Sequence, residues 1–221
     1  MIGQNSISLL NDFLQSIGRY YAIVIYSLIT IILTIRLIKD KKESGNINLI
    51  RLLILGVFGC VYWINILEFL AFETPILPVD AIGFQINDFS LYNFGLGLAV
   101  TLGIVLAAYI NQLKPFYFTA LYFYFGLLVL YFYAGTSLIL LPYIYITGIT
   151  ALTLQMYTGL KLKDNGALGV AVFFAIAFVT ILLPEEGVIG VLDALATLIY
   201  ATFGLIFALG YFKPFKEPGG K

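Results

Sequence analysis

The chain has 221 residues, of which 61% are hydrophobic and only 11% are charged. An average soluble domain carries roughly 25% charged residues, so this composition leaves too little polar surface to cover a water-soluble globule. The 12 basic and 12 acidic residues cancel, and this balance gives no indication of a nucleic-acid partner.

The residue types that are scarce exclude several kinds of chemistry. The chain contains no histidine and one cysteine, Cys60. It therefore lacks the imidazole ligands of haem, zinc, copper and non-haem iron sites, and it cannot form an intrachain disulfide. We expect no haem or histidine-ligated metal as a cofactor, while a bound lipid is compatible with the composition. Scarcity of Cys, Met and His is also typical of proteins from thermophiles.

Residues 1–18 are more polar than residues 20–38 and have an amphipathic pattern. Their apolar residues recur at helical spacing: Ile7, Leu10, Phe13, Leu14 and Ile17. The segment lacks the basic start and the small-residue cleavage site of a signal peptide. The pattern predicts an interfacial helix that leads into the first membrane span.

Seven apolar segments come after residue 18, each close to the 20 or so residues that cross a hydrocarbon core. They are residues 20–38, 49–71, 91–111, 116–134, 138–160, 167–183 and 188–211. We predict an all-α integral membrane protein, a bundle of about seven transmembrane helices. In this division, residues 1–18 form the interfacial segment, residues 19–212 form the transmembrane domain and residues 213–221 form a short cytoplasmic tail.

The fourth and fifth segments are separated by a length argument. Residues 116–160 form one nearly uncharged stretch. A continuous helix of that length would be about 68 Å long, more than twice the thickness of a hydrocarbon core. The chain must therefore turn back, and Gly135 to Ser137 is the place where its composition allows a turn.

Charge predicts the orientation of this bundle. All but one of the 12 basic residues fall in the loops and tail on one side of the predicted membrane, and Arg19 alone falls on the other. By the positive-inside rule, the basic side is cytoplasmic. We therefore expect the N-terminus outside, the C-terminus in the cytoplasm and the protein in the cell membrane.

Small residues form a stripe on the third segment. Gly95, Ala99, Gly103 and Ala107 recur at intervals of four and share one helical face. Such a stripe lets two helix backbones approach closely in lipid. It predicts a packing face inside the bundle or, as the alternative, the seam of a homodimer.

Two carboxylates fall inside predicted spans. Glu68 lies near the outer end of the second segment, and Asp193 lies near the outer end of the seventh. Because an acidic side chain at membrane depth costs about 2.5–3.5 kcal/mol, it indicates a functional site by default. The alternative is a structural role, in which a neighbouring hydroxyl or backbone amide binds the carboxylate.

Further polar residues cluster around this pair. Asn65 shares a helical face with Glu68, while Asp88, Glu185 and Glu186 fall just outside the spans at the same end. Their oxygens could hold a hard cation, and because burial disfavours a charged carboxyl they could also exchange a proton. No basic residue falls within the spans at this level, which favours a cation or a proton as the ligand.

Two comparisons with membrane families narrow the chemistry. Retinal proteins carry a lysine midway along the last span, and the seventh segment contains none, so we expect no retinal. The sequence from Ile181 to Glu186 resembles the Pro-x-Glu-Glu region of membrane lycopene cyclases, although the residue between proline and the glutamates is missing. That resemblance implies acid catalysis on a polyene.

Three functions therefore remain open. The first is a small transporter or channel for a cation or a proton-coupled solute that uses Glu68 and Asp193. The second is a non-catalytic accessory or scaffold subunit of a larger membrane complex. The third is a membrane enzyme that acts on a lipid or isoprenoid. The partners that we expect are the lipid bilayer and either other membrane subunits or further copies of the chain.

Overall fold

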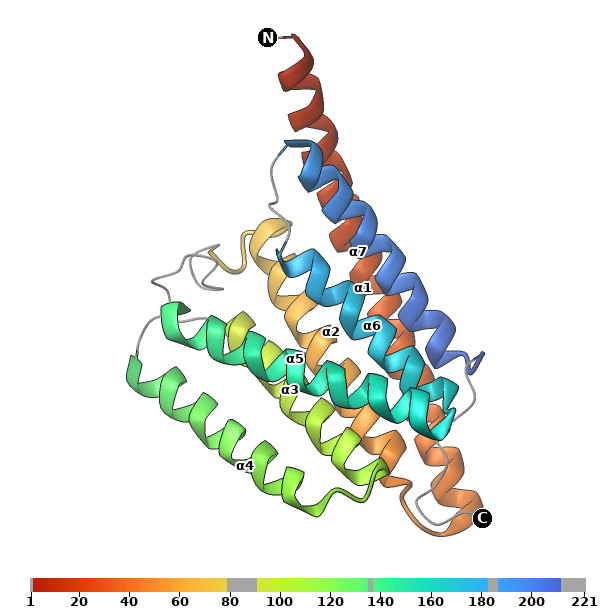
Figure 1. Cartoon of the computed structure of the whole chain (residues 1–221). Coiled ribbons are helices and arrows are strands. Elements are labelled where there is room, and N and C mark those ends of the chain that lie inside the picture. The colour runs from red at the N-terminus through yellow and green to blue at the C-terminus, as the bar shows by residue number, and fades with distance from the viewer. Residues whose placement is uncertain (1, 79–90, 135–136, 183–186, 212–221) are drawn as a thin grey trace.

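The computed structural model describes residues 2–78, 91–134, 137–182 and 187–211, and within these ranges its regular elements are all helices (Figure 1). The helices are α1 (Ile2–Ser44), α2 (Leu49–Phe72), α3 (Leu91–Ile110), α4 (Lys114–Val129), α5 (Ser137–Leu162), α6 (Asn165–Leu182) and α7 (Gly187–Ala208). A π-helical turn, η2 (Leu130–Ala134), extends α4. The predicted all-α helical bundle is confirmed.

The helix boundaries agree with hydropathy from the second segment onward. Helices α2 to α7 begin and end within three residues of the predicted segments, when η2 is counted with α4. Helix α1 differs, because it runs without a break from residue 2 through the predicted boundary at residue 18. Its 43 residues correspond to about 65 Å. The division into an interfacial segment and a membrane domain stays a prediction, and the tail at 213–221 lies outside the described residues.

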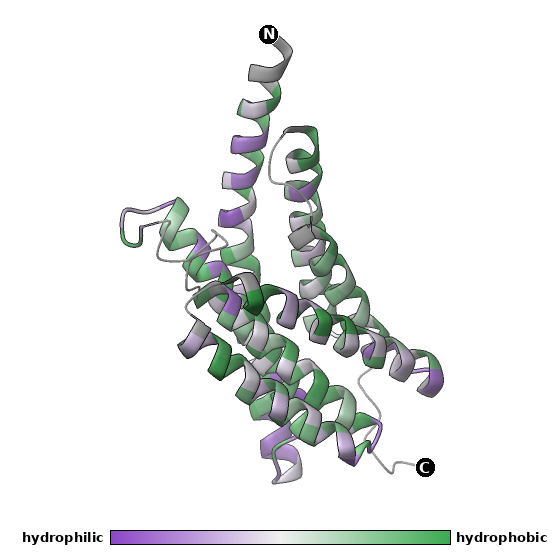
Figure 2. Ribbon diagram, turned by 60° about the vertical axis from the view of Figure 1, so that its left-hand side comes forward, coloured by the Kyte–Doolittle hydropathy of each residue, from purple (hydrophilic) through white to green (hydrophobic). Residues whose placement is uncertain are grey.

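The helices are those of a membrane protein. Among the described residues, six helices are long and apolar enough to cross a bilayer, and the apolar part of α6 is shorter. Figure 2 shows hydrophobic residues along most of each helix, with hydrophilic residues on the outer part of α1 and near helix ends. In a soluble protein, exposed faces of this kind would have to be covered. The chain is therefore a multi-pass membrane protein.

Six of the helices form a ring. Helix α1 packs against α2 and α7, α2 against α3, α3 against α5, and α6 against both α5 and α7. Helix α4 stays outside this ring and packs mainly against α3 (Figure 1). The ring order makes α1 and α7 neighbours although they stand at opposite ends of the chain.

Two apolar clusters hold the bundle together. The larger one joins side chains of α1, α2, α3, α6 and α7, with Tyr26, Phe58 and Phe173 among the most buried. The smaller one joins α3, α4 and α5 around Ile104 and Leu127. Since α3 contributes to both clusters, it is the helix that connects the two parts of the core.

The small residues of α3 lie inside the molecule. Gly95, Ala99, Gly103 and Ala107 are all buried. A Cβ atom at Gly95 would lie 3.0 Å from the Ile64 side chain of α2, and one at Gly103 would lie 3.8 Å from Ala151 of α5. The stripe thus packs against neighbouring helices of the same chain.

A close contact between the backbones of two helices is testable at Gly159. A Cβ atom there would lie 2.8 Å from the backbone nitrogen of Leu168 in α6. We expect Gly159→Ala to destabilise the protein by about 1–3 kcal/mol, because a helix backbone cannot move aside as a side chain can. The measurement is the midpoint of thermal unfolding in detergent.

Gly59→Ala is the matched control, because a Cβ atom at Gly59 of α2 has nothing within 4 Å. Alanine there should be neutral or stabilise the helix by about 0.5–1 kcal/mol. Equal losses of stability in the two variants would contradict the close contact between α5 and α6.

The orientation can be tested at two exposed residues of α1, Asp12 and Lys42. In a Cys60→Ser background, a membrane-impermeant maleimide should label Asp12→Cys in intact cells and should label Lys42→Cys only after permeabilisation. The reverse pattern would invert the predicted topology, and labelling of both from outside would show that α1 does not cross.

Candidate functional site

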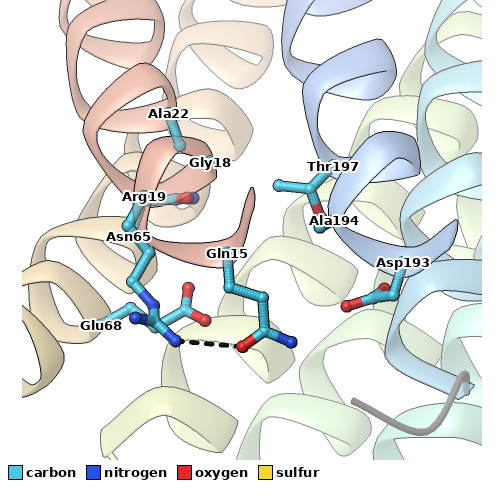
Figure 3. A pocket seen from close by; sticks show the side chains of 9 residues that line it. All are labelled: Gln15, Gly18, Arg19, Ala22, Asn65, Glu68, Asp193, Ala194 and Thr197. Atoms are coloured by element: carbon cyan, nitrogen blue, oxygen red, sulfur yellow. Dashed lines mark hydrogen bonds between the residues drawn. The ribbon is translucent and has the colours of Figure 1, made fainter. Parts of the chain in front are cut away.

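A cavity of about 60 Å³ lies between the N-terminal halves of α1 and α7 and the C-terminal half of α2 (Figure 3). A water molecule needs about 10–15 Å³ of such volume, so the cavity holds several waters or a small hydrated ion. Its lining residues are Gln15, Gly18, Arg19 and Ala22 of α1, Asn65 and Glu68 of α2, and Asp193, Ala194 and Thr197 of α7.

Helical periodicity explains why these side chains share the cavity. On each helix the lining positions are separated by one, three or four residues, so they fall on a single face. Gly18 and Ala22 on α1 and Ala194 on α7 have little or no side chain, and a Cβ atom at Gly18 would have nothing within 4 Å. The polar lining residues therefore extend into the space that these small residues leave.

The cavity brings together the two carboxylates that the sequence singled out. Glu68 and Asp193 are both half-buried, and they enter the cavity from different helices (Figure 3). Glu68 lies four residues from the end of α2, and Asp193 lies six residues from the start of α7. At 1.5 Å per residue, these positions are about 6 and 9 Å inside the helix ends.

Arg19 corrects the expectation that no basic residue lies near the acids. Its Nη1 atom is 2.8 Å from Oε1 of Glu73, and its Nη2 atom donates to Oε1 of Gln15 at 3.4 Å. Ser16 Oγ donates to the other carboxylate oxygen of Glu73 at 3.0 Å, and the guanidinium carbon lies 4.2 Å from the centre of the Phe72 ring. Hydropathy places Arg19 just before the predicted first span. In the structure α1 runs through this position without a break, and Arg19 lines the same cavity as the two acids.

The floor of the cavity is polar. Asn65 is buried, and its Nδ2 atom donates to the backbone carbonyl of Val61 at 2.7 Å. Next to this part of the bundle lies the partly buried ring of Tyr200 from α7, which packs against the apolar cluster that contains Tyr26. Tyr26 lies four residues beyond the lining residue Ala22 and Tyr200 three beyond Thr197, and the centres of the two rings are 6.1 Å apart, so α1 and α7 each supply one tyrosine just below the cavity.

Below the two tyrosines the bundle is closed by apolar side chains. At Gly204 of α7, a Cβ atom would lie 3.1–3.3 Å from side-chain atoms of Ile29, Phe173 and Phe58. The Phe58 and Phe173 rings are 4.9 Å apart. These contacts separate the cavity from the inner ends of the same helices.

The structure therefore gathers some of the predicted site residues and leaves others unplaced. Glu68, Asp193 and Asn65 line one cavity. Asp88, Glu185 and Glu186 lie outside the described residues. The sequence alone did not single out Gln15, Arg19, Thr197, Tyr26 or Tyr200, although the spacing of polar residues along 15–19 was a usable signal.

In the described part of the chain, no group of three or more His, Cys, Asp or Glu side chains could hold a metal ion. The cavity instead combines two carboxylates with amide and hydroxyl groups. Comparisons with protein-family models, curated proteins and solved structures found no match to this chain.

The Arg19–Glu73 ion pair is the best-defined polar contact beside the cavity, and its two side chains are only 18% and 12% exposed. We expect Glu73→Gln to destabilise the protein by about 1.5–3 kcal/mol, because it leaves a shielded guanidinium without its counter-charge. Unfolding in detergent measures this loss.

Glu43→Gln provides the control, since the Lys39–Glu43 pair is 3.7 Å long with side chains 72% and 64% exposed. Its loss should change stability by less than about 0.5 kcal/mol. A Glu73→Gln variant as stable as Glu43→Gln would show that the Arg19 pair contributes little.

Proposed function

We propose that this chain is a small transporter or channel for a cation or a proton-coupled small solute, and that the cavity between α1, α2 and α7 is its binding site. One observation carries the proposal: Glu68 and Asp193, which are far apart in the sequence, line one cavity in the outer half of a membrane bundle. Two carboxylates in such a place are costly unless a positive partner or protonation compensates them.

The charges around the cavity favour a positive occupant. Arg19 lines it, but Glu73 lies 2.8 Å from the guanidinium and matches its charge. Among the lining residues, the two acidic side chains of Glu68 and Asp193 outnumber the one basic side chain, that of Arg19. Because both carboxylates are half-buried, they attract a cation more strongly than they would at a fully exposed surface.

The size of the cavity favours a small occupant. Pockets that hold organic ligands commonly measure about 300–1,000 Å³, whereas this cavity is about 60 Å³. An inorganic cation with a few waters, or a proton carried by the carboxylates and those waters, fits this volume. The amide of Asn65 and the hydroxyl of Thr197 add neutral oxygen ligands.

The predicted orientation gives the proposal a direction. Basic residues at the opposite ends of the helices predict that the cavity end faces the outside of the cell membrane. The occupant then enters from outside, and the apolar contacts around Gly204 form the barrier that it has to pass.

Flux measurements in proteoliposomes test the proposal. With sodium, potassium and protons as the ions tested, Glu68→Gln and Asp193→Asn should each lower flux at least tenfold, because each removes one of the two carboxylates that line the cavity. Asp12→Asn is the matched control, since Asp12 is an exposed carboxylate on the same side of the bundle that does not line the cavity. It should leave flux within twofold of wild type.

Two results would contradict the proposal. One is flux that both cavity substitutions leave unchanged. The other is a wild-type protein that carries none of the three ions and is isolated from mild detergent together with other membrane proteins, a result that supports the accessory-subunit hypothesis.

A further inference from the structure

The first and last three helices occupy equivalent places in the ring. If α1 is exchanged with α5, α2 with α6 and α3 with α7, every packing contact of the ring becomes another contact of the ring. Helix α4 stands outside the ring and links the two sets. Because α1 and α5 are four crossings apart, they run in the same direction, and the two sets have the same orientation.

The sequence supports this equivalence. Residues 21–40 of α1 align without a gap with residues 145–164, which span the end of α5 and the turn after it. The identical pairs are Tyr21 and Tyr145, Ile25 and Ile149, Leu28 and Leu152, Thr34 and Thr158, Lys39 and Lys163, and Asp40 and Asp164.

Each of the paired aspartates contacts the first turn of the next helix, although by a different kind of bond. Asp40 Oδ1 accepts a hydrogen bond of 2.7 Å from Nη1 of Arg51, in the first turn of α2. Asp164 Oδ1 accepts hydrogen bonds of 2.8 and 3.1 Å from the backbone nitrogens of Gly166 and Ala167, in the first turn of α6. Asp40 thus ties α1 to the start of α2, while Asp164 lies in the turn after α5 and caps the start of α6.

We propose that α1–α3 and α5–α7 are two repeats related by an approximate two-fold axis along the membrane normal, and that the protein transports its ion by moving one repeat against the other at the α1–α7 contact. This inference rests on the proposed function. In transporters built from parallel repeats, binding sites lie where the repeats meet.

The cavity has that position. Glu68 belongs to the first repeat and Asp193 to the second, so a cation between them attracts both repeats toward the same point. Next to the cavity, the Tyr26 ring of the first repeat and the Tyr200 ring of the second are 6.1 Å apart, so the repeats also meet there. Occupancy of the cavity therefore changes the free energy of closing the α1–α7 contact.

The other contact between the repeats, α3 with α5, is held by polar side chains. Gln155 of α5 is fully buried, and its Nε2 atom donates to the Gly103 carbonyl of α3 at 3.1 Å. Asn111 of α3 also donates a hydrogen bond to Thr158 of α5. Because hydrogen bonds between buried groups are costly to break in apolar surroundings, this contact is the fixed edge about which the repeats turn.

The inner end of the α1–α7 contact is closed in this structure. Arg36 Nη2 of α1 donates to the backbone carbonyl of Leu209, just after α7, at 2.6 Å. Movement toward an inward-facing state has to break this hydrogen bond and separate Gly204 from Ile29. A covalent link at this end should therefore stop transport without touching the cavity.

The test cross-links this end in a Cys60→Ser background. Arg36→Cys with Leu209→Cys joins the two repeats, and Asp40→Cys with Arg51→Cys joins α1 to α2 within one repeat at the same end of α1. Each pair is treated with a short bifunctional thiol reagent that forms reducible bonds. Each uncross-linked double variant is its own reference for sodium, potassium and proton flux in proteoliposomes.

The cross-link between repeats should lower flux at least tenfold, with recovery after dithiothreitol, while the link within the first repeat should change flux less than twofold. The inference would be overturned if the two links had equal effects, or if the α1–α7 link left flux unchanged. Loss of flux in Glu68→Gln together with insensitivity to the α1–α7 link would reject the moving repeats and keep the proposed function.

A distance measurement tests the inference if no ion is transported. Spin labels at Phe13→Cys and Leu192→Cys report on the two repeats, and labels at Phe13→Cys and Ile76→Cys report within the first repeat; all three positions are exposed. When the pH is changed from 5 to 8 in sodium or potassium chloride, the distance between the labels at 13 and 192 should change, and the distance between the labels at 13 and 76 should not. Failure of the first distance to shift would overturn the moving repeats.

Discussion

The low polarity of the bilayer is the constraint on which the rest of this structure depends. Backbone groups in hydrocarbon have no water to bind, so each crossing has to satisfy its own hydrogen bonds, and a helix does this. The same medium penalises charged side chains, which either collect at the helix ends or meet a partner within the bundle. Helix lengths, the placement of lysines and the convergence of Glu68 and Asp193 are all consistent with this one condition.

Apolar surface does not by itself hold such helices together, because lipid tails solvate leucine as well as protein does. Close packing has to replace that driving force. Here it comes from the small residues of α3, from glycines such as Gly159 and Gly204 that admit a neighbouring helix, and from the aromatic side chains around Phe58. The polar cavity lies where this packing is interrupted between α1, α2 and α7.

Hydropathy predicted most of the fold because its signal is local. A run of apolar residues ended by charge or by glycine gives the limits of a helix, and six of the seven helices ended where the pattern indicated. Helix α1 was the exception, since residues 2–18 keep helical spacing without being apolar enough to resemble a span. Arg19 lies at the boundary between these residues and the predicted span, and its interaction with Glu73 joins α1 to the end of α2.

The sequence alone determined the fold class, the helix boundaries from α2 to α7 and the two in-span carboxylates, because each depends on the free energy of placing a residue in hydrocarbon. It could not determine which helices meet. Only the tertiary structure brought α7 beside α1, excluded α4 from the ring, and placed Asp193 in one cavity with Glu68 and Arg19. The reason is physical: burial in lipid depends on a residue and its near neighbours, whereas helix pairing depends on shape and small polar contacts between distant segments.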